Sequence, residues 1–275
     1  MTSSRPTYFH RLRAPLEGRV IVVKIGGSPL GEGDSTVPDI IELWRAGARP
    51  VVVHGGGKVI SDWVRKQGIE PQFVRGLRKT DRATLDVAVA VLAGLVNTEI
   101  VAEFQSLGAT AIGLSGVSGG MLQGVLQDPD LGLVGRIVSA DPAPVQAILD
   151  AGAIPVIAPA AFYVDPPRGA ASRVLNVNAD TAAGHVAKAL PAGQLIFQTD
   201  VEGVLDARRR LIPRMTRRQA LDLINSGVAA GGMIPKIEAC ADAVGTVGSG
   251  HIIDGRVRGA LLRCVAGEDI GTRIV

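Results

Sequence analysis

The chain has 275 residues, of which 47% are hydrophobic and 20% are charged, and its formal net charge at pH 7 is +3. A chain of this length and composition can bury a substantial core and form one large domain or two modest lobes. The arginine-rich segment 208–218 contains no aromatic residues, whereas a nucleic-acid groove usually offers aromatic stacking platforms. We therefore expect a solvated hairpin there, with an anion or partner surface as the alternative, and no nucleic-acid partner.

The two cysteines, Cys240 and Cys264, show no metal-ligand spacing and are too few for a disulfide framework. This usage fits a reducing, cytoplasmic environment. The N-terminal extension, residues 1–19, is polar, basic and interrupted by prolines, unlike a signal peptide. No apolar run approaches the roughly 18 residues of a membrane span, so we expect no membrane partner.

Short apolar segments that end in turn residues alternate with helical patterns along the rest of the chain. Strands are expected at 20–25, 50–53, 109–114, 154–158, 194–199 and 251–253. Helices are expected at 37–46, 58–67, 81–105, 141–151, 179–189, 216–226 and 235–247. Short apolar strands that alternate with helices form a mostly parallel sheet covered on both faces, so the pattern predicts an α/β fold.

Two segments bear on the organisation of this fold. The helix expected at 81–105 is apolar on more than one side, which is typical of burial inside the fold or against a second subunit, so we expect a homodimer through it. The segment 164–175 is rich in proline and glycine. We expect a hinge or hairpin there, between an N-terminal lobe over 20–175 and a C-terminal lobe over 176–275.

Glycine clusters follow three of the expected strands, at 24–28, 54–57 and 113–120. Ligands of open α/β sheets bind beyond the carboxyl ends of the strands, where glycines let backbone N–H groups approach an anion. Neither a P-loop motif nor a strand-linked G-x-G-x-x-G motif is present. For any one cluster, a simple tight turn is an equally good interpretation; together they favour a site that holds anions.

Polar clusters make this prediction sharper. Arg78 precedes the long helix, and Lys236 follows two glycines at the start of another. Asn176, Asn178 and Asp180 stand together at a helix start. Helix capping explains one of these three residues but not all of them.

Seven motifs occur in a fixed order: KIGG (24–27), HGGG (54–57), GLR (76–78), GLSG (113–116), NVNADTAAG (176–184), TDVEGVLD (199–206) and GGMIPKIEAC (231–240). In this order and over residues 20–272 the chain resembles the amino acid kinase family, in particular its members that phosphorylate N-acetyl-L-glutamate. The resemblance implies an open αβα sandwich with two lobes. It also implies transfer of a phosphoryl group from ATP, with Mg²⁺ carried on the phosphates and no protein metal site, to the side-chain carboxylate in arginine biosynthesis.

The resemblance also implies roles for individual residues. Lys24 and Lys236 correspond to the catalytic lysines, and Asp180 to the residue that orients them. The acyl amino acid is expected at the N-terminal lobe, held by Gly56, Gly57, Arg78 and Asn176. The nucleotide is expected at the C-terminal lobe, with contacts from Gly26, Gly27, Thr199, Asp200, Val201, Gly203, Val204, Leu205, Val228, Ala229, Ala230 and Met233.

The chemistry of such a transfer agrees with these residue types. A carboxylate is ionised near neutral pH, so no base is needed to create the nucleophile. The protein must instead position two anions and neutralise the charge that spreads during transfer, for which lysine is a compact, mobile cation. We therefore expect His54 to be a structural turn residue rather than a base, and His251 to be structural or part of an effector pocket.

Other readings stay open at this point. A sister kinase acting on another N-acylated amino acid, such as a protected aminoadipate, would use the same motifs. A non-catalytic amino-acid sensor on the same scaffold is disfavoured because both lysines and Asp180 are present. A dimer is favoured over a hexamer, because the short proline-containing extension suits a long linking helix poorly. Sensitivity to arginine stays undecided.

Overall fold

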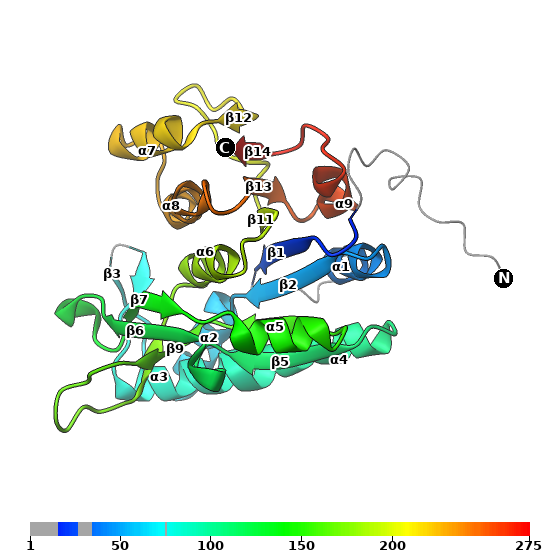
Figure 1. Ribbon diagram of the computed structural model, residues 1–275. Helices are drawn as coiled ribbons and strands as arrows, with labels where there is room; N and C mark the ends of the chain where they lie inside the picture. Colours follow the sequence, from blue (N-terminus) through cyan, green and yellow to red (C-terminus); the bar gives the residue numbers. More distant parts are fainter. Residues whose placement is uncertain (1–15, 27–34, 75) are drawn as a thin grey trace.

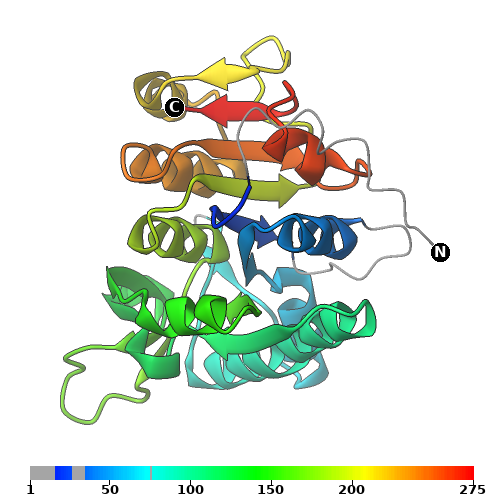
Figure 2. The same cartoon turned by 45° about the vertical axis from the view of Figure 1, so that its right-hand side comes forward.

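The computed structural model describes residues 16–26, 35–74 and 76–275. Gly27, one of the expected nucleotide contacts, lies outside these ranges. Within them, eight strands form a central sheet (Figures 1 and 2). Their order is β12 (Arg214–Met215), β14 (Thr272–Ile274), β13 (Gly250–Asp254), β11 (Gln194–Thr199), β1 (Val20–Ile25), β2 (Arg49–His54), β8 (Ile154–Ala158) and β5 (Ala111–Ser115).

The six strands from β13 to β5 run parallel, while β14 pairs antiparallel with β13. The chain first builds β1 and β2 and later adds strands on either side of them, so β1 lies in the middle of the sheet. Apart from Lys24 its residues are β-branched, and all but Val20 are buried, as expected of a central strand covered on both faces. The expected mostly parallel α/β architecture is confirmed.

Helices cover both faces of the sheet (Figure 1). One apolar cluster joins Val22 and Phe197 of the sheet to α5 (Ala143–Asp150), α6 (Ala179–Ala189) and α8 (Met233–Ala243). The other joins Val23 and Ile196 to the opposite layer, which consists of α1 (Thr36–Arg45), α2 (Gly57–Lys66), α9 (Ala260–Val265) and the long helix described next. Adjacent residues of one strand thus enter different cores, as the pleat dictates.

The long helix runs from Arg82 to Ser106 and has three parts: α3 (Arg82–Val89), a π-helical stretch η2 (Ala90–Val96) and α4 (Asn97–Ser106). Asp81 caps it by accepting a hydrogen bond from the Thr84 backbone N–H. Contrary to expectation, it is long and apolar enough to cross a membrane by length and composition, with 39% of its most apolar stretch buried. The core helix of a globular protein passes the same test, and this one packs against β5 and β8.

The expected elements lie close to their predicted positions. All six strands and all seven helices are present, and the ranges 20–25, 154–158, 179–189 and 194–199 have the predicted bounds. The helix expected at 235–247 ends at Ala243, because Val244 leaves the helical conformation with ψ at 130°. The sequence did not predict α9, which lies in the same layer as α1 and α2.

A second sheet was not predicted either. It contains β10 (Val174–Asn176), β9 (Ala160–Tyr163), β6 (Leu122–Leu126) and β7 (Gly135–Ala140), in that order. A two-stranded hairpin, β3 (Phe73–Val74) with β4 (Leu77–Arg78), stands beside it. The segment expected as a hinge or hairpin, 164–175, connects the antiparallel strands β9 and β10. The division into lobes at this segment stays a prediction.

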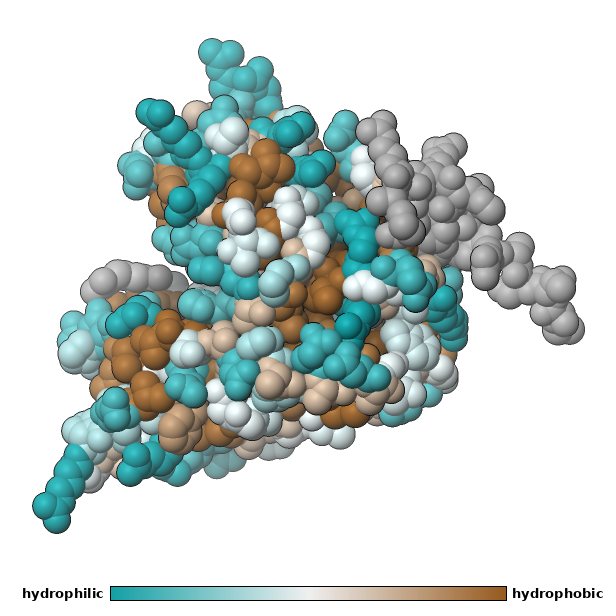
Figure 3. Space-filling view, viewed as in Figure 1, coloured by the Kyte–Doolittle hydropathy of each residue, from teal (hydrophilic) through white to brown (hydrophobic). Residues whose placement is uncertain are grey.

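Only the first part of the arginine-rich segment, Arg208 to Arg210, lies in an exposed hairpin between β11 and β12, which is closed by an antiparallel bridge between Leu205 and Leu211. Arg214 belongs to β12, and the last two arginines belong to the helix that follows. In Figure 3 the hairpin belongs to the hydrophilic projection above the C-terminal part of the molecule. Asp206 anchors its turn by accepting hydrogen bonds from the backbone N–H groups of Arg208 and Arg210. A following helix, α7 (Arg217–Asn225), begins at a capping box formed by Thr216 and Gln219.

Candidate active site

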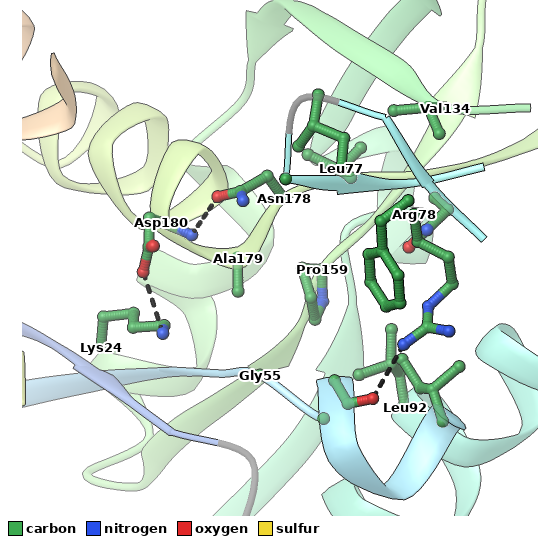
Figure 4. Close-up of a pocket in the computed structure, with 17 residues that line it drawn as sticks. Lys24, Gly55, Leu77, Arg78, Leu92, Val134, Pro159, Asn178, Ala179 and Asp180 are labelled. Carbon is green, nitrogen blue, oxygen red and sulfur yellow. Dashed lines mark hydrogen bonds and ion pairs between the residues drawn. The ribbon is translucent and has the colours of Figure 1, made fainter. Parts of the chain in front are cut away.

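A cavity of about 240 Å³ lies beyond the carboxyl ends of β1 and β2 (Figure 4). The parts of the chain that enclose it include the end of β1, the glycine turn after β2, the β3–β4 hairpin, the long helix at Leu92 and the start of α6. Carboxyl ends of parallel strands are where open α/β sheets bind ligands. The lining residues are Lys24, Gly55, Gly56, Gly57, Ile60, Phe73, Gly76, Leu77, Arg78, Leu92, Val134, Pro159, Asn176, Val177, Asn178, Ala179 and Asp180.

Two lysines from distant parts of the chain meet at one carboxylate beside this cavity. Lys24 Nζ lies 2.9 Å from Asp180 Oδ1, and Lys236 Nζ lies 2.9 Å from Asp180 Oδ2. Lys236 Nζ donates one hydrogen bond to Asp180 Oδ2 and another to the Gly232 carbonyl. The Lys24 contact is an ion pair that is not aligned as a hydrogen bond, so Oδ1 lacks a well-directed donor. The group carries a net charge of +1.

The position of Asp180 follows from local structure. It occupies the first turn of α6, where the Asn178 side chain accepts hydrogen bonds from the backbone N–H groups of Asp180 and Thr181. Burial opposes ionisation of Asp180, but the positive charges of Lys24 and Lys236, which both contact the carboxylate, outweigh it. The pKa of Asp180 therefore lies below its ordinary value, and this residue is an anion that holds cations rather than a proton carrier.

The glycine turn after β2, Gly55 to Gly57, lines the cavity with its backbone. Gly56 leaves room for the long helix, since a Cβ there would lie only 2.7 Å from Leu92 Cδ2. Gly57 begins α2, and the first N–H groups of a helix have no partner within it. These groups and the positive end of the helix favour an anion at this wall of the cavity.

Arg78 lies across the cavity from Lys24 (Figure 4). Its Nη2 donates hydrogen bonds to the Gly57 carbonyl and to Ser61 Oγ, both at 2.8 Å, and its guanidinium lies 4.8 Å from the ring centre of Phe73. Among the residues that the structure describes, its buried Nη1 has no hydrogen-bond partner. Burial, with a contribution from nearby Arg65, lowers the pKa of Arg78, yet a guanidinium stays charged in proteins. Nη1 of Arg78 is therefore a fixed donor that can bind an acceptor group of a ligand.

Asn176 completes the set of residues expected to hold the acyl amino acid. It ends β10, lines the cavity and donates a hydrogen bond from Nδ2 to Thr80 Oγ1 at 3.2 Å. Together with Gly56, Gly57 and Arg78 it brings all four expected substrate residues to one cavity. Sequence reasoning missed the apolar wall, which is formed by Ile60, Phe73, Leu77, Leu92, Val134 and Pro159.

The described residues expected to hold a nucleotide do not line this cavity. Thr199 ends β11, which is parallel to β1, so 199–205 emerges at the same edge of the sheet. Val228, Ala229 and Ala230 lie between α7 and α8, and Met233 opens the helix that carries Lys236. Gly26, at the end of β1, is exposed.

Some of these residues have a structural explanation. Val204 is buried in the core, and its backbone N–H donates to Thr272 Oγ1. A Cβ at Gly203 would lie 2.7 Å from Leu211, so packing alone requires a glycine there. Their contact with a nucleotide stays a prediction. Among residues 16–26, 35–74 and 76–275, no group of three or more His, Cys, Asp or Glu side chains could hold a metal ion.

Known proteins resemble this chain in sequence and in fold. An acetylglutamate kinase from Dehalococcoides mccartyi is 39% identical over 260 residues, covering 94% of this chain and 96% of that protein. An acetylglutamate kinase from Caldanaerobacter subterraneus is 43% identical over 267 residues, with 94% and 87% coverage.

Among solved structures, N-acetylglutamate synthase from Neisseria gonorrhoeae superposes with a TM-score of 0.82 at 26% identity, over 99% of this chain and 64% of that one. The model of the amino acid kinase family matches residues 19–254. With this match over most of its length, the chain belongs to the amino acid kinase family.

Proposed function

We propose that the protein transfers the γ-phosphoryl group of ATP to the side-chain carboxylate of N-acetyl-L-glutamate, a step of arginine biosynthesis. The observation that carries this proposal is the meeting of Lys24 and Lys236 at the buried Asp180, on the rim of a cavity whose far side offers the unpartnered Nη1 of Arg78. Relatives called acetylglutamate kinase, 39–43% identical over 94% of this chain, support it.

The cavity matches an acyl amino acid with two carboxylates. Nη1 of Arg78 and the amide of Asn176 suit the α-carboxylate, because a guanidinium donates in a planar fork. The side-chain carboxylate would then point to the opposite end, toward Lys24 and the N–H groups of Gly56 and Gly57. The apolar wall would pack against the methylene groups and the acetyl methyl group.

The residues at the reacting end stabilise charge and need not transfer a proton. An ionised carboxylate attacks phosphorus directly, so no residue needs to remove a proton. Negative charge spreads over the transferring group, and preorganised cations stabilise it without reorganising during the reaction. Lys24 is mounted on a rigid central strand and Lys236 on the first turns of α8. Asp180 holds both ammonium groups against one carboxylate and offsets their repulsion.

Membership of the family implies the use of ATP. We propose that the nucleotide lies along 199–205 and 228–233, which places its phosphates beside Lys236. Mg²⁺ prefers oxygen ligands and commonly binds through phosphates. The donors fit this arrangement, because both oxygens of Asp180, the buried carboxylate at the site, face lysines. When bound, the ion would neutralise part of the phosphate charge.

A homodimer through the long helix is also proposed. Its outward surface carries the small residues Ala90, Ala93 and Gly94, which are exposed and would allow close packing of a second copy. A cytoplasmic location fits the two unpaired, buried cysteines and stays a prediction.

The proposal is tested by trapping the acyl phosphate with hydroxylamine. The assay compares N-acetyl-L-glutamate with the shorter N-acetyl-L-aspartate and the longer N-acetyl-L-2-aminoadipate. We expect N-acetyl-L-glutamate to give the highest kcat/KM. A clearly higher value for the aminoadipate derivative would instead assign the enzyme to that substrate, and no hydroxamate with any of the three would refute kinase activity on acyl amino acids.

A further inference from the structure

His54 ends β2 and is fully buried, and it does not line the cavity. Both of its ring nitrogens have partners. Nδ1 lies 3.0 Å from the Gly55 carbonyl oxygen, and Nε2 lies 3.1 Å from Nδ2 of Asn97, the first residue of α4. The same Asn97 nitrogen donates to the Val156 carbonyl on β8 at 2.9 Å.

These contacts assign the protons. The Asn97 amide nitrogen carries two hydrogens, and the Val156 carbonyl accepts one of them. The other points at His54 Nε2, which must therefore present a lone pair, so the ring proton lies on Nδ1 and is donated to the Gly55 carbonyl. Burial, aided by the charge of nearby Lys24, lowers the pKa of His54 to about 4, although the Gly55 hydrogen bond opposes this. The ring is thus neutral at neutral pH.

Asn97 is itself held in place. A Cβ at Gly113 of β5 would lie 1.9 Å from Asn97 Oδ1, so the glycine makes room for this amide. Asn97 follows the π-helical stretch that contains Leu92, five residues earlier. On an α-helix, residues five apart point about 140° away from each other, whereas the i→i+5 ladder of a π-helix brings them to one side. The π-helix therefore lets Leu92 and Asn97 both face the glycine turn.

We infer that Asn97 and His54 are positioning residues that orient the Gly55–Gly57 turn for the acceptor carboxylate; this inference rests on the proposed function. The Gly55 carbonyl and the Gly56 N–H belong to one planar peptide group. A hydrogen bond to the carbonyl fixes that plane, and with it the direction of the N–H. It also polarises the peptide group, which makes the N–H a better donor.

The turn is thus held from two sides by one helix. Leu92 packs against Gly56, and Asn97 acts on Gly55 through His54. Small displacements of a group that positions a reacting atom can cost about 100-fold in rate. This arrangement explains why the residue before the three glycines is a buried, uncharged histidine although the reaction needs no base.

Two variants separate positioning from mere core packing. In His54→Asn the side-chain amide can take the place of Nδ1 and donate to the Gly55 carbonyl. In His54→Gln the longer amide reaches toward Asn97 and leaves the Gly55 carbonyl without its donor. Each variant keeps one of the two hydrogen bonds, so their unfolding midpoints in urea should be similar. We expect kcat of His54→Gln to lie about 10- to 100-fold below that of His54→Asn, with KM for ATP unchanged in both.

Equal kcat values in the two variants would overturn the inference, since packing alone would then explain the histidine. The tautomer provides a second test that needs no turnover: ¹⁵N NMR of the imidazole in the unmodified protein should show hydrogen on Nδ1, and hydrogen on Nε2 would also overturn it. A failure of the proposed function looks different, because the unmodified protein would then form no acyl phosphate while the NMR result would stand.

Discussion

Replacing Asp180 with asparagine removes the negative charge that both lysines contact. Each ammonium nitrogen lies 2.9 Å from a carboxylate oxygen. At this distance and an effective dielectric constant of ~20, Coulomb's law gives about 6 kcal/mol of gross attraction per pair. Burial of the charges offsets much of this attraction, and removing one partner of a buried pair costs roughly 3–5 kcal/mol.

We therefore expect Asp180→Asn to lower the free energy of unfolding by about 3 kcal/mol, the lower end of that range, because the lysines can move toward the cavity. Turnover should fall by about 100- to 1,000-fold, since two charge donors lose their common anchor. Urea denaturation and the hydroxamate assay measure the two effects. The matched control is Asp86→Asn, which breaks an exposed ion pair with Arg82 and should cost only ~0.3–0.5 kcal/mol without affecting turnover.

Stability and turnover together decide whether Asp180 holds the two lysines for catalysis. If Asp180→Asn were as stable and as active as the Asp86→Asn control, the carboxylate would hold neither lysine in solution. If it lost stability but kept its kcat, the ion pairs would be structural and the proposed roles of Lys24 and Lys236 would be wrong.

Arg78, the two buried histidines and the exposed side of the long helix each give a further prediction. Arg78→Lys keeps a positive charge but loses the fork that presents Nη1, so KM for N-acetyl-L-glutamate should rise by about 10- to 100-fold in initial-rate assays; an equal rise for ATP would contradict this. The pKa values of buried His54 and His251 are lowered to about 4, so the unfolded chain binds more protons than the folded one between pH 4 and 6.5, and stability should be lost as pH falls through this window. Urea denaturation at several pH values should show a slope that approaches, near the middle of this window, the limit of about 2.7 kcal/mol per pH unit set by two protons. A flat profile would mean that the histidines are not buried in the neutral form. Ala90→Arg, on the exposed side of the long helix, should convert a dimer to a monomer in light scattering with its helical circular dichroism retained, whereas an unchanged mass would exclude this surface as the interface.

Much of the fold follows from local sequence. The mostly β-branched run at 20–25 is typical of a strand buried on both faces, and the glycines and capping residues that end such runs mark the helices that follow. The second sheet escaped prediction because its strands carry polar or small residues among the apolar ones, as in Leu122–Leu126 and Ala160–Tyr163. Their pairing is set by tertiary contacts between distant segments rather than by local pattern.

In the site, too, some features could be predicted from the sequence and others depend on tertiary contacts. The convergence of Lys24 and Lys236 was predictable from ordered motifs, although their sequence separation hides it from any local pattern. The apolar wall and the His54–Asn97 contact were not predictable, because the sequence does not indicate which residue a leucine or asparagine of an apolar helix will contact. The π-helical turn that brings Leu92 and Asn97 to one side has no sequence signature that propensity could reveal.

The central claim is that the side-chain carboxylate of N-acetyl-L-glutamate attacks the phosphorus of ATP, and an isotope experiment tests it most directly. The substrate would carry oxygen-18 in that carboxylate only, and hydroxylamine would trap the product by attacking its carbonyl carbon. The released phosphate should then contain one oxygen-18 atom, as detected by ³¹P NMR or mass spectrometry. Phosphate without the label, formed at the same rate as ADP, would contradict the proposal.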